Sequence, residues 1–168
     1  DTRVVEMDSV IGRVGGKVLL TLMFRDCGLM LAFLRDRNDS QSVIDAFVLL
    51  WELAGPCLFR RLFPVLLTDN GSPFLAHAFA AECQRFRIRH KRTRAYRPQT
   101  NGKAERFIQT LLREWAYARA YRSSGERRRA LPAYLRHYNH RRPHTGIHRA
   151  TPMSRLVPPG NNLMRNDT

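Results

Sequence analysis

The chain has 168 residues, and 43% of them are hydrophobic, which is enough for one folded domain with a buried core. With 26% charged and 10% aromatic residues, the composition excludes a disordered or a fibrous chain. We find no uninterrupted apolar run of the length that a membrane span needs and no secretory leader. Three cysteines without a Cys-x-x-Cys pair argue against a disulfide scaffold or a structural zinc cluster and fit a reducing cytosol.

The net charge of +15 is concentrated in the second half of the chain. Residues 1–84 carry eight Lys and Arg against ten Asp and Glu, whereas residues 85–168 carry 21 against four. Such a one-sided charge repels itself unless a polyanion lies against it, and the planar fork of arginine suits phosphate oxygens. An acidic membrane surface is the competing partner, but residues 85–97 form a short alternating stretch and a loop, not an amphipathic helix. The charge therefore predicts a nucleic-acid partner.

Three strands joined by short turns are predicted at the start of the chain, over residues 3–10, 17–25 and 29–35. The second is a near-continuous apolar run, which is typical of a strand buried on both faces. An amphipathic helix follows, with a cap at residues 38–40 and an end at Gly55-Pro56.

The rest of the chain alternates strands and helices. We predict a strand over 63–68, a helix over 73–86, a charged edge strand over 87–93 and a loop over 94–100. A long helix begins at Asn101, and another covers 126–140, where Pro132 bends or divides it. Beyond residue 142 the chain is expected to be irregular. This order predicts an α/β fold with a mixed sheet flanked by helices.

Three acidic residues are candidates for a metal site. Asp8 lies in the first strand, Asp69 follows the strand over 63–68, and Glu105 lies in the first turn of the long helix. Each has an ordinary explanation, as an outward strand residue, a turn residue and a dipole-favoured helix start, respectively. Glu105, however, lies in a segment (85–149) with 19 basic residues and three acids. A carboxylate there suits divalent cations that face a phosphate backbone.

The sequence around these acids resembles the catalytic core of the DDE transposase and retroviral-type integrase superfamily. The matching motifs are VEMDS around Asp8, TDNGSPF from Thr68 and YRPQTNGKAERF up to Phe107, with 35 residues between Asp69 and Glu105. The block YNHRRPH from Tyr138, with a later Thr-Pro, resembles the end of such cores in bacterial insertion-sequence transposases. Up to about Asp69 the chain is more similar to the IS30 group, and beyond it to the IS481 and IS3 groups.

This resemblance implies a ribonuclease-H-like fold, with a five-stranded mixed sheet of three antiparallel strands and two more. It implies a catalytic core over residues 1–156 with a polar tail over 157–168. The family normally carries a helix-turn-helix domain ahead of this core, and we expect that domain to be absent from this chain. Asp8, Asp69 and Glu105 would be the catalytic, metal-binding triad of a polynucleotidyl transferase. Two Mg²⁺ ions, which Mn²⁺ could replace, would be bound, with Asp8 bridging them. Water would first cleave a phosphodiester at the element end, and the freed 3′-OH would then attack target DNA.

The resemblance also implies a partner and a place in the cell. The partner would be double-stranded DNA, both element ends and target, bound by a homodimer or higher oligomer, without a membrane. The enzyme would work in the bacterial cytoplasm, at the nucleoid. Asn70 and Gly71 are expected to support the active site. The expected DNA contacts surround the loop before the long helix: Lys91, Arg92, Arg94, Tyr96, Arg97, Gln99, Asn101, Lys103 and Arg106.

Two other functions remain open. The first is a nuclease of the same fold that cleaves RNA–DNA hybrids or junctions, which the arginine-rich segment and the YNHRRPH block disfavour. The second is an inactive DNA-binding remnant, which would not need to keep all three acids. A zinc site built from His137, His140, His144 and His148 is disfavoured because Pro143 interrupts the helical register and no cysteine is near. His90 is expected to be a strand-edge residue and not a general base.

Overall fold

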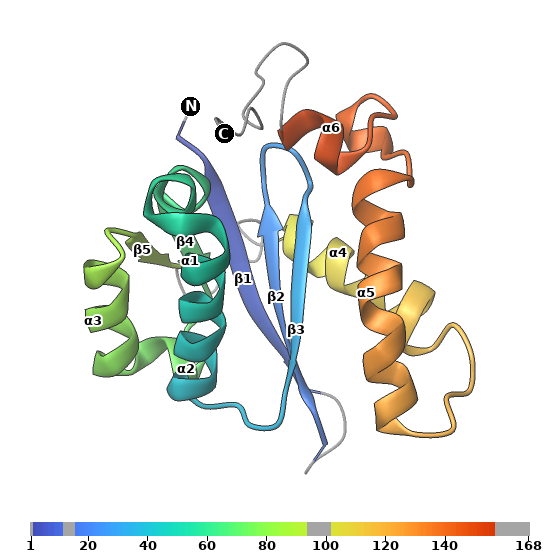
Figure 1. The fold of residues 1–168 in the computed structure, drawn as a ribbon, viewed down its shortest axis with the longest axis horizontal. Coiled ribbons are helices and arrows are strands. Elements are labelled where there is room, and N and C mark those ends of the chain that lie inside the picture. The colour runs from blue at the N-terminus through green and yellow to red at the C-terminus, as the bar shows by residue number, and fades with distance from the viewer. Residues whose placement is uncertain (1, 12–15, 94–101, 157–168) are drawn as a thin grey trace, which may run out of the picture.

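A five-stranded sheet with the order β3-β2-β1-β4-β5 forms the centre of the molecule (Figure 1). The computed structural model describes residues 2–11, 16–93 and 102–156, with the backbone alone at 102–104. The strands β1 (Val4–Ile11), β2 (Val18–Phe24) and β3 (Met30–Arg35) form an antiparallel meander. The short strands β4 (Val65–Thr68) and β5 (Arg89–Arg92) continue the sheet in parallel to β1. The predicted mixed α/β sheet is confirmed.

Helices cover both faces of the sheet, which explains why all seven residues of β2 are buried. On one face, α1 (Ser40–Leu62), α2 (Ser72–Leu75) and α3 (His77–Arg85) surround an aromatic-rich core that includes Leu20 and Phe24 of β2. On the other face, α4 (Gly102–Leu111), the π-helical η2 (Leu112–Ala116) and α5 (Ser124–His140) pack on Leu19 and Met23. Side chains on the two faces of β2 therefore belong to two separate cores.

Helix α1 extends beyond its predicted end. Gly55 adopts a left-handed backbone (φ 72°, ψ 159°), and Pro56 opens a second helical segment after this kink. The segment continues to Leu62 because Phe59 is fully buried in the aromatic core. The predicted helix end at Gly55-Pro56 was therefore wrong, because a short helical segment continues from Pro56 to Leu62.

By length and composition alone, α1 is also the one helix among the described residues that could cross a membrane, with a mean hydropathy of 1.6 over its most apolar window. Its residues Val43 and Phe47 nevertheless pack inside the aromatic core, and the kink at Gly55 interrupts the helix. We therefore assign α1 to the folded domain.

Three further boundaries differ from the predictions. The helix expected over 73–86 is two helices, α2 and α3, because Ala76 between them is extended (φ −64°, ψ 137°). Helix α5 begins at Ser124, where the Ser123 side chain accepts a hydrogen bond from the Glu126 amide at 3.1 Å, and it continues through Pro132. After residue 142 the chain forms η3 (Thr145–Ile147) and α6 (Pro152–Leu156) instead of irregular structure. The predicted loop over 94–100 and tail over 157–168 lie outside the described residues.

The block YNHRRPH fixes the end of α5 to the rest of the domain. The buried Asn139 side chain accepts a hydrogen bond from the Met30 amide at 2.9 Å and donates one to the Met30 carbonyl at 2.8 Å. Arg142 donates to Glu114 of η2 at 2.7 Å, and the His144 ring lies edge-on to Tyr138, 4.4 Å between centroids. The block therefore closes the free edge of β3 and joins α5 to η2.

Candidate active site

Strand register brings Asp8 and Asp69 together. Met7 of β1 is paired with Thr68 of the parallel β4, so the next residue on each strand is an aspartate. Adjacent parallel strands lie about 4.8 Å apart, and both aspartates are half-buried. Asp8 is also paired with Thr21, which lies between two residues of the core under α4 and α5. The Asp8 side chain therefore stands on the face of the sheet that α4 covers.

Glu105 approaches the same face from the first turn of α4, where its side chain is exposed. Burial is the largest cause that raises the pKa of Asp8 to about 6, and the charges of Asp69 and, more weakly, Glu105 raise it further. The Ser9 amide, which donates to Asp8 Oδ1 at 2.7 Å, opposes this effect. Asp8 therefore lies close enough to both other predicted acids to be affected by their charges.

The chemistry of this donor set fits a hard divalent cation. Carboxylate oxygens are the ligands that Mg²⁺ prefers, and a cation would relieve the repulsion that raises the pKa of Asp8. No three His, Cys, Asp or Glu side chains of the described residues lie close enough together to form a metal site already. The carboxylates of Asp69 and Glu105 thus lie near Asp8, but the three side chains are not close enough to bind one ion together in this conformation.

The turn after β4 fixes the Asp69 carboxylate. Its Oδ1 accepts a hydrogen bond from the Gly71 amide at 2.9 Å. A Cβ atom on Gly71 would lie 2.9 Å from the same oxygen, so a side chain there would displace the carboxylate. Asn70 instead directs its amide to the Thr93 carbonyl at 3.2 Å, which ties the turn to the end of β5.

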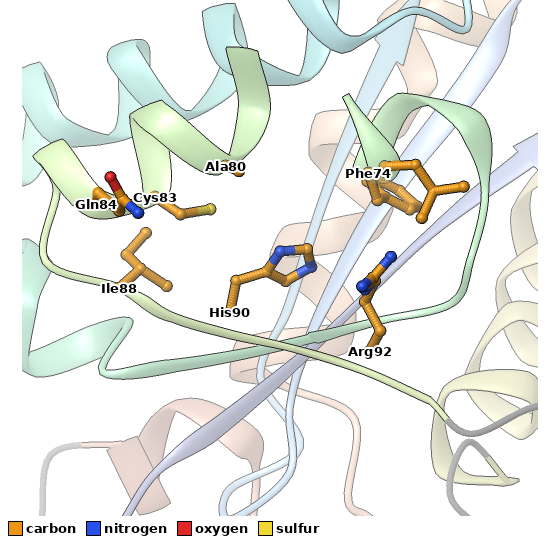
Figure 2. A pocket seen from close by; sticks show the side chains of 8 residues that line it. Phe74, Ala80, Cys83, Gln84, Ile88, His90 and Arg92 are labelled. Atoms are coloured by element: carbon orange, nitrogen blue, oxygen red, sulfur yellow. The ribbon is translucent and has the colours of Figure 1, made fainter. Parts of the chain in front are cut away.

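Thr68 and His90 support Asp69 from the other side of the sheet. The Thr68 hydroxyl donates to the Asp69 carbonyl at 2.9 Å and lies 2.9 Å from His90 Nε2. His90 packs edge-on against Phe79 and faces a groove of about 340 Å³ between α3 and β5, beside Arg92 (Figure 2). Burial, helped by Arg92, lowers the pKa of His90, so its ring is neutral at pH 7 and serves as a hydrogen-bond partner of Thr68. The alternation of β5 predicts that His90 and its neighbours at 89 and 91 point to opposite faces of the sheet. The contact between His90 and Thr68 could not be predicted, because it depends on how β4 and β5 are paired.

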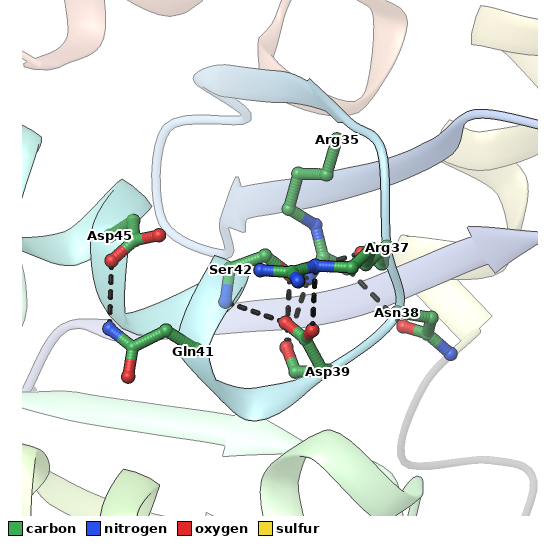
Figure 3. A network of polar contacts seen from close by, with 7 residues as sticks. All are labelled: Arg35, Arg37, Asn38, Asp39, Gln41, Ser42 and Asp45. Carbon is green, nitrogen blue, oxygen red and sulfur yellow. Dashed lines mark hydrogen bonds and ion pairs between the residues drawn. The ribbon is translucent and has the colours of Figure 1, made fainter.

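A buried arginine supports the strand that carries Asp8. Arg35 is 6% exposed and donates to the Ser9 hydroxyl at 2.8 Å and to the Ser42 hydroxyl at 2.7 Å. Asp39 caps α1 by accepting from the Ser42 amide at 2.8 Å, so the part of the network in Figure 3 joins the end of β3 to the start of α1. The Ser9 contact joins it to β1. The sequence alone does not indicate this network, because an arginine at a strand end normally faces solvent.

The predicted DNA contacts fall into two groups. Lys91 and Arg92 are exposed on β5, where Arg92 is paired with Thr68, and Arg106 is exposed on α4 next to Glu105. Arg106 therefore adjoins Glu105, and Lys91, which is paired with Leu67, lies on the face of the carboxylates. Arg92 instead faces the groove beside His90 on the opposite face of the sheet. Lys103 is described by its backbone alone, within α4. The others lie outside the described residues: Arg94, Tyr96, Arg97, Gln99 and Asn101.

Residues 86–152 match the integrase core domain family. An uncharacterised protein of Caenorhabditis elegans is 36% identical over 87 residues, which cover 52% of this chain and 7% of that protein. An uncharacterised protein of insertion element IS136 from Agrobacterium fabrum is 29% identical over 86 residues, 51% of this chain and 44% of the relative. The chain thus spans less than half the length of these curated relatives.

Solved structures share the fold. A chain of the simian T-cell lymphotropic virus intasome, in complex with the PP2A regulatory subunit B56 gamma, aligns with a TM-score of 0.75 and 20% identity, over 99% of this chain and 58% of that chain. The catalytic core domain of BIV integrase aligns with a TM-score of 0.69 and 21% identity, over 93% and 95% of the two chains. The predicted integrase-core fold, which is ribonuclease-H-like, is confirmed.

Proposed function

The chain belongs to the DDE transposase and retroviral-type integrase superfamily, and we propose that its residues 1–156 form a catalytic core that cuts and joins DNA. The reaction is hydrolysis of a phosphodiester at an element end, followed by attack of the freed 3′-OH on target DNA. The observation that carries this proposal is the register of β1 and β4, which sets Asp8 beside Asp69 on the side where Glu105 enters.

The roles of the side chains follow from their positions. Asp8, Asp69 and Glu105 would hold two Mg²⁺ ions, or Mn²⁺ in their place. Bound there, the ions would polarise the phosphodiester and activate the attacking oxygen. Gly71 orients the Asp69 carboxylate through its amide. Lys91 and Arg106 would contact phosphates next to the cleaved bond, which positions DNA without selecting its sequence.

Substitution of Asp69 separates catalysis from binding. We expect Asp69→Asn to retain duplex affinity and to lose Mg²⁺-dependent nicking and strand joining, because one oxygen donor is replaced by an amide nitrogen. The matched control is Asp45→Asn on α1, an exposed acid that donates nothing to the site. Equal activity of Asp69→Asn and Asp45→Asn would refute the assignment.

The same assay discriminates the two alternatives. A nuclease of this fold would cleave an RNA–DNA hybrid faster than a DNA duplex and would not join strands. An inactive remnant would bind DNA with no Mg²⁺-dependent cleavage even in the unsubstituted chain. The presence of all three acids, with Asp8 close to the charges of Asp69 and Glu105, supports an active site over a remnant.

We further propose a homodimer or higher oligomer on DNA, acting in the bacterial cytoplasm at the nucleoid. The outer side of α1 exposes Leu49 and Leu53, which are 44% and 76% accessible and lie one helical turn apart. An apolar strip on a helix that already buries its other side supports contact with a second copy.

A further inference from the structure

The connection between η2 and α5 carries a dense positive charge that the proposed active site does not use. Residues 117–129, here called the arginine turn, contain five arginines and one acid, Glu126. The Arg119 side chain is 61% exposed and that of Arg128 54%, and Arg122 and Arg129 are also exposed. Tyr117, 72% exposed, presents an aromatic ring beside them.

The arginine turn is built on a packed scaffold. The buried Trp115 donates its indole N–H to the Arg127 carbonyl at 3.2 Å, and its own carbonyl accepts from the Tyr121 hydroxyl at 2.9 Å. The Ser123 side chain caps α5. The arginines are therefore held at a defined surface, which reduces the entropy cost of binding a ligand there.

Packing brings like charges together in the arginine turn. The guanidinium groups of Arg119 and Arg127 lie 4.9 Å and 5.5 Å from the centroid of the same Tyr121 ring. Glu126 is shared, since one carboxylate oxygen lies 3.0 Å from Arg119 and the other accepts from the Arg122 amide at 2.8 Å. Asp36 of the loop after β3 lies 3.9 Å from Arg128, so two carboxylates face five cations, and an external anion would lower the remaining repulsion.

The position of the cluster on α5 points to the same partner. Arg127, Arg128 and Arg129 lie in the first turns of α5, at the positive end of the helix dipole. Cations are unfavourable at this end and anions are favourable. Several arginines close to a helix start, with an exposed tyrosine, match the phosphate backbone of a nucleic acid better than an isolated small anion.

We propose that the arginine turn binds the phosphate backbone of double-stranded DNA that extends from the proposed active site. Helices α4 and η2 connect the two places, on the same face of the sheet (Figure 1). Tyr117 follows Glu105 by 12 residues, or about 18 Å at roughly 1.5 Å per residue. At about 3.4 Å per base pair, the arginine turn contacts phosphates about five base pairs from the reacting bond. This position rests on the proposed function, whereas the contact with DNA does not.

The test compares two triple variants that lose equal charge. Arg119→Gln/Arg122→Gln/Arg129→Gln removes exposed cations of the arginine turn, and Arg60→Gln/Arg61→Gln/Arg87→Gln removes three exposed cations from the α1 and α3 side. Binding of a fluorescent 30-base-pair duplex is measured by anisotropy in EDTA at several salt concentrations. Each neutralised phosphate contact contributes about 0.9 to the slope of log K against log salt. We expect the variant of the arginine turn to bind the duplex at least ten-fold more weakly than the α1/α3 control at 0.1 M salt. The magnitude of its slope of log K against log salt should be lower than that of the control by 2 to 3.

Circular dichroism and the single variant Arg122→Gln guard against a folding defect, because that exposed side chain alone should reduce the slope by about 1. Affinities and slopes of the turn variant equal to those of the α1/α3 control would overturn the proposal and assign the arginine turn to an acidic protein surface. The assay contains no metal and no reaction, so failure of the catalytic proposal leaves its outcome unchanged. Phosphate-ethylation interference then tests the distance, with protected phosphates expected about five base pairs from the cleavage point.

Discussion

The amide of Gly71 donates to Oδ1 of Asp69 at 2.9 Å, and the place where a Cβ of residue 71 would stand is 2.9 Å from that same oxygen. Gly71 therefore has two effects: its amide orients the Asp69 carboxylate, and its lack of a side chain leaves room for that carboxylate. The backbone of Gly71 is extended (φ −61°, ψ 146°), so an alanine meets no backbone strain there. The close approach alone accounts for the glycine.

We expect Gly71→Ala to reduce strand joining by about 100-fold, since a shift of the order of 1 Å in a catalytic group has that effect. Duplex affinity and the free energy of unfolding should change little. A gel assay of strand joining in Mg²⁺ measures the loss. Gly146→Ala is the control, because a Cβ at Gly146 meets no atom within 4 Å. If both alanine variants kept full activity, Asp69 would not need its present orientation.

Asp8→Asn should stabilise the fold above pH 6 in the absence of metal. The pKa of Asp8 is raised from 3.8 to about 6, so the folded state retains a proton that the unfolded state has released. Stability contributed by the neutral carboxyl is therefore present at pH 4 and is lost as the pH rises through 6. Asparagine avoids this loss, and we expect a gain of roughly 1 kcal/mol at pH 7.5, after allowance for solvent screening. Urea unfolding at pH 4 and 7.5 measures the difference, which should vanish at pH 4.

The same variant tests metal binding without a reaction. Mg²⁺ should raise the melting temperature of the unsubstituted chain, because a ligand of the folded state stabilises it by mass action. Asp8→Asn should lose most of this increase. An equal Mg²⁺-dependent shift in both chains would place the bound ion away from Asp8.

The three acids were assigned from the resemblance of their motifs, and their catalytic role stays a prediction. Local pattern was enough to predict the sheet, because each strand is bounded by turns. It could not reveal where Asp8 lies relative to Asp69, since strand register is set by long-range packing. The Thr68–His90 contact and the Arg35 network depend on the same register. The extension of α1 past Gly55 was missed because the burial of Phe59, a tertiary contact, outweighs two residues that locally end helices.

Asn139→Ala should destabilise the domain by about 2 kcal/mol or more. Its side chain makes two hydrogen bonds to Met30, and alanine would leave both buried backbone groups without these partners. Chemical unfolding monitored by circular dichroism measures the loss. Gln109→Ala removes an exposed amide from α4 and should stay within about 0.5 kcal/mol of the parent chain. A cost for Asn139→Ala no larger than for Gln109→Ala would mean that the edge of β3 is satisfied by other groups.

Leu49→Glu/Leu53→Glu should shift the protein from oligomer to monomer. Both side chains are largely exposed on the outer side of α1, so charges there oppose contact with a second copy and leave the cores intact. Sedimentation velocity, with and without duplex DNA, measures the assembly state. Ile11→Glu is the control. Ile11 lies on β1, is 58% exposed and is similar in size to leucine, so a charge there should leave the assembly unchanged. Because strand transfer joins two DNA molecules, we also expect the α1 variant to lose joining more than nicking. A parent chain that stays monomeric on DNA, or an α1 variant that assembles as the parent does, would remove α1 from the interface.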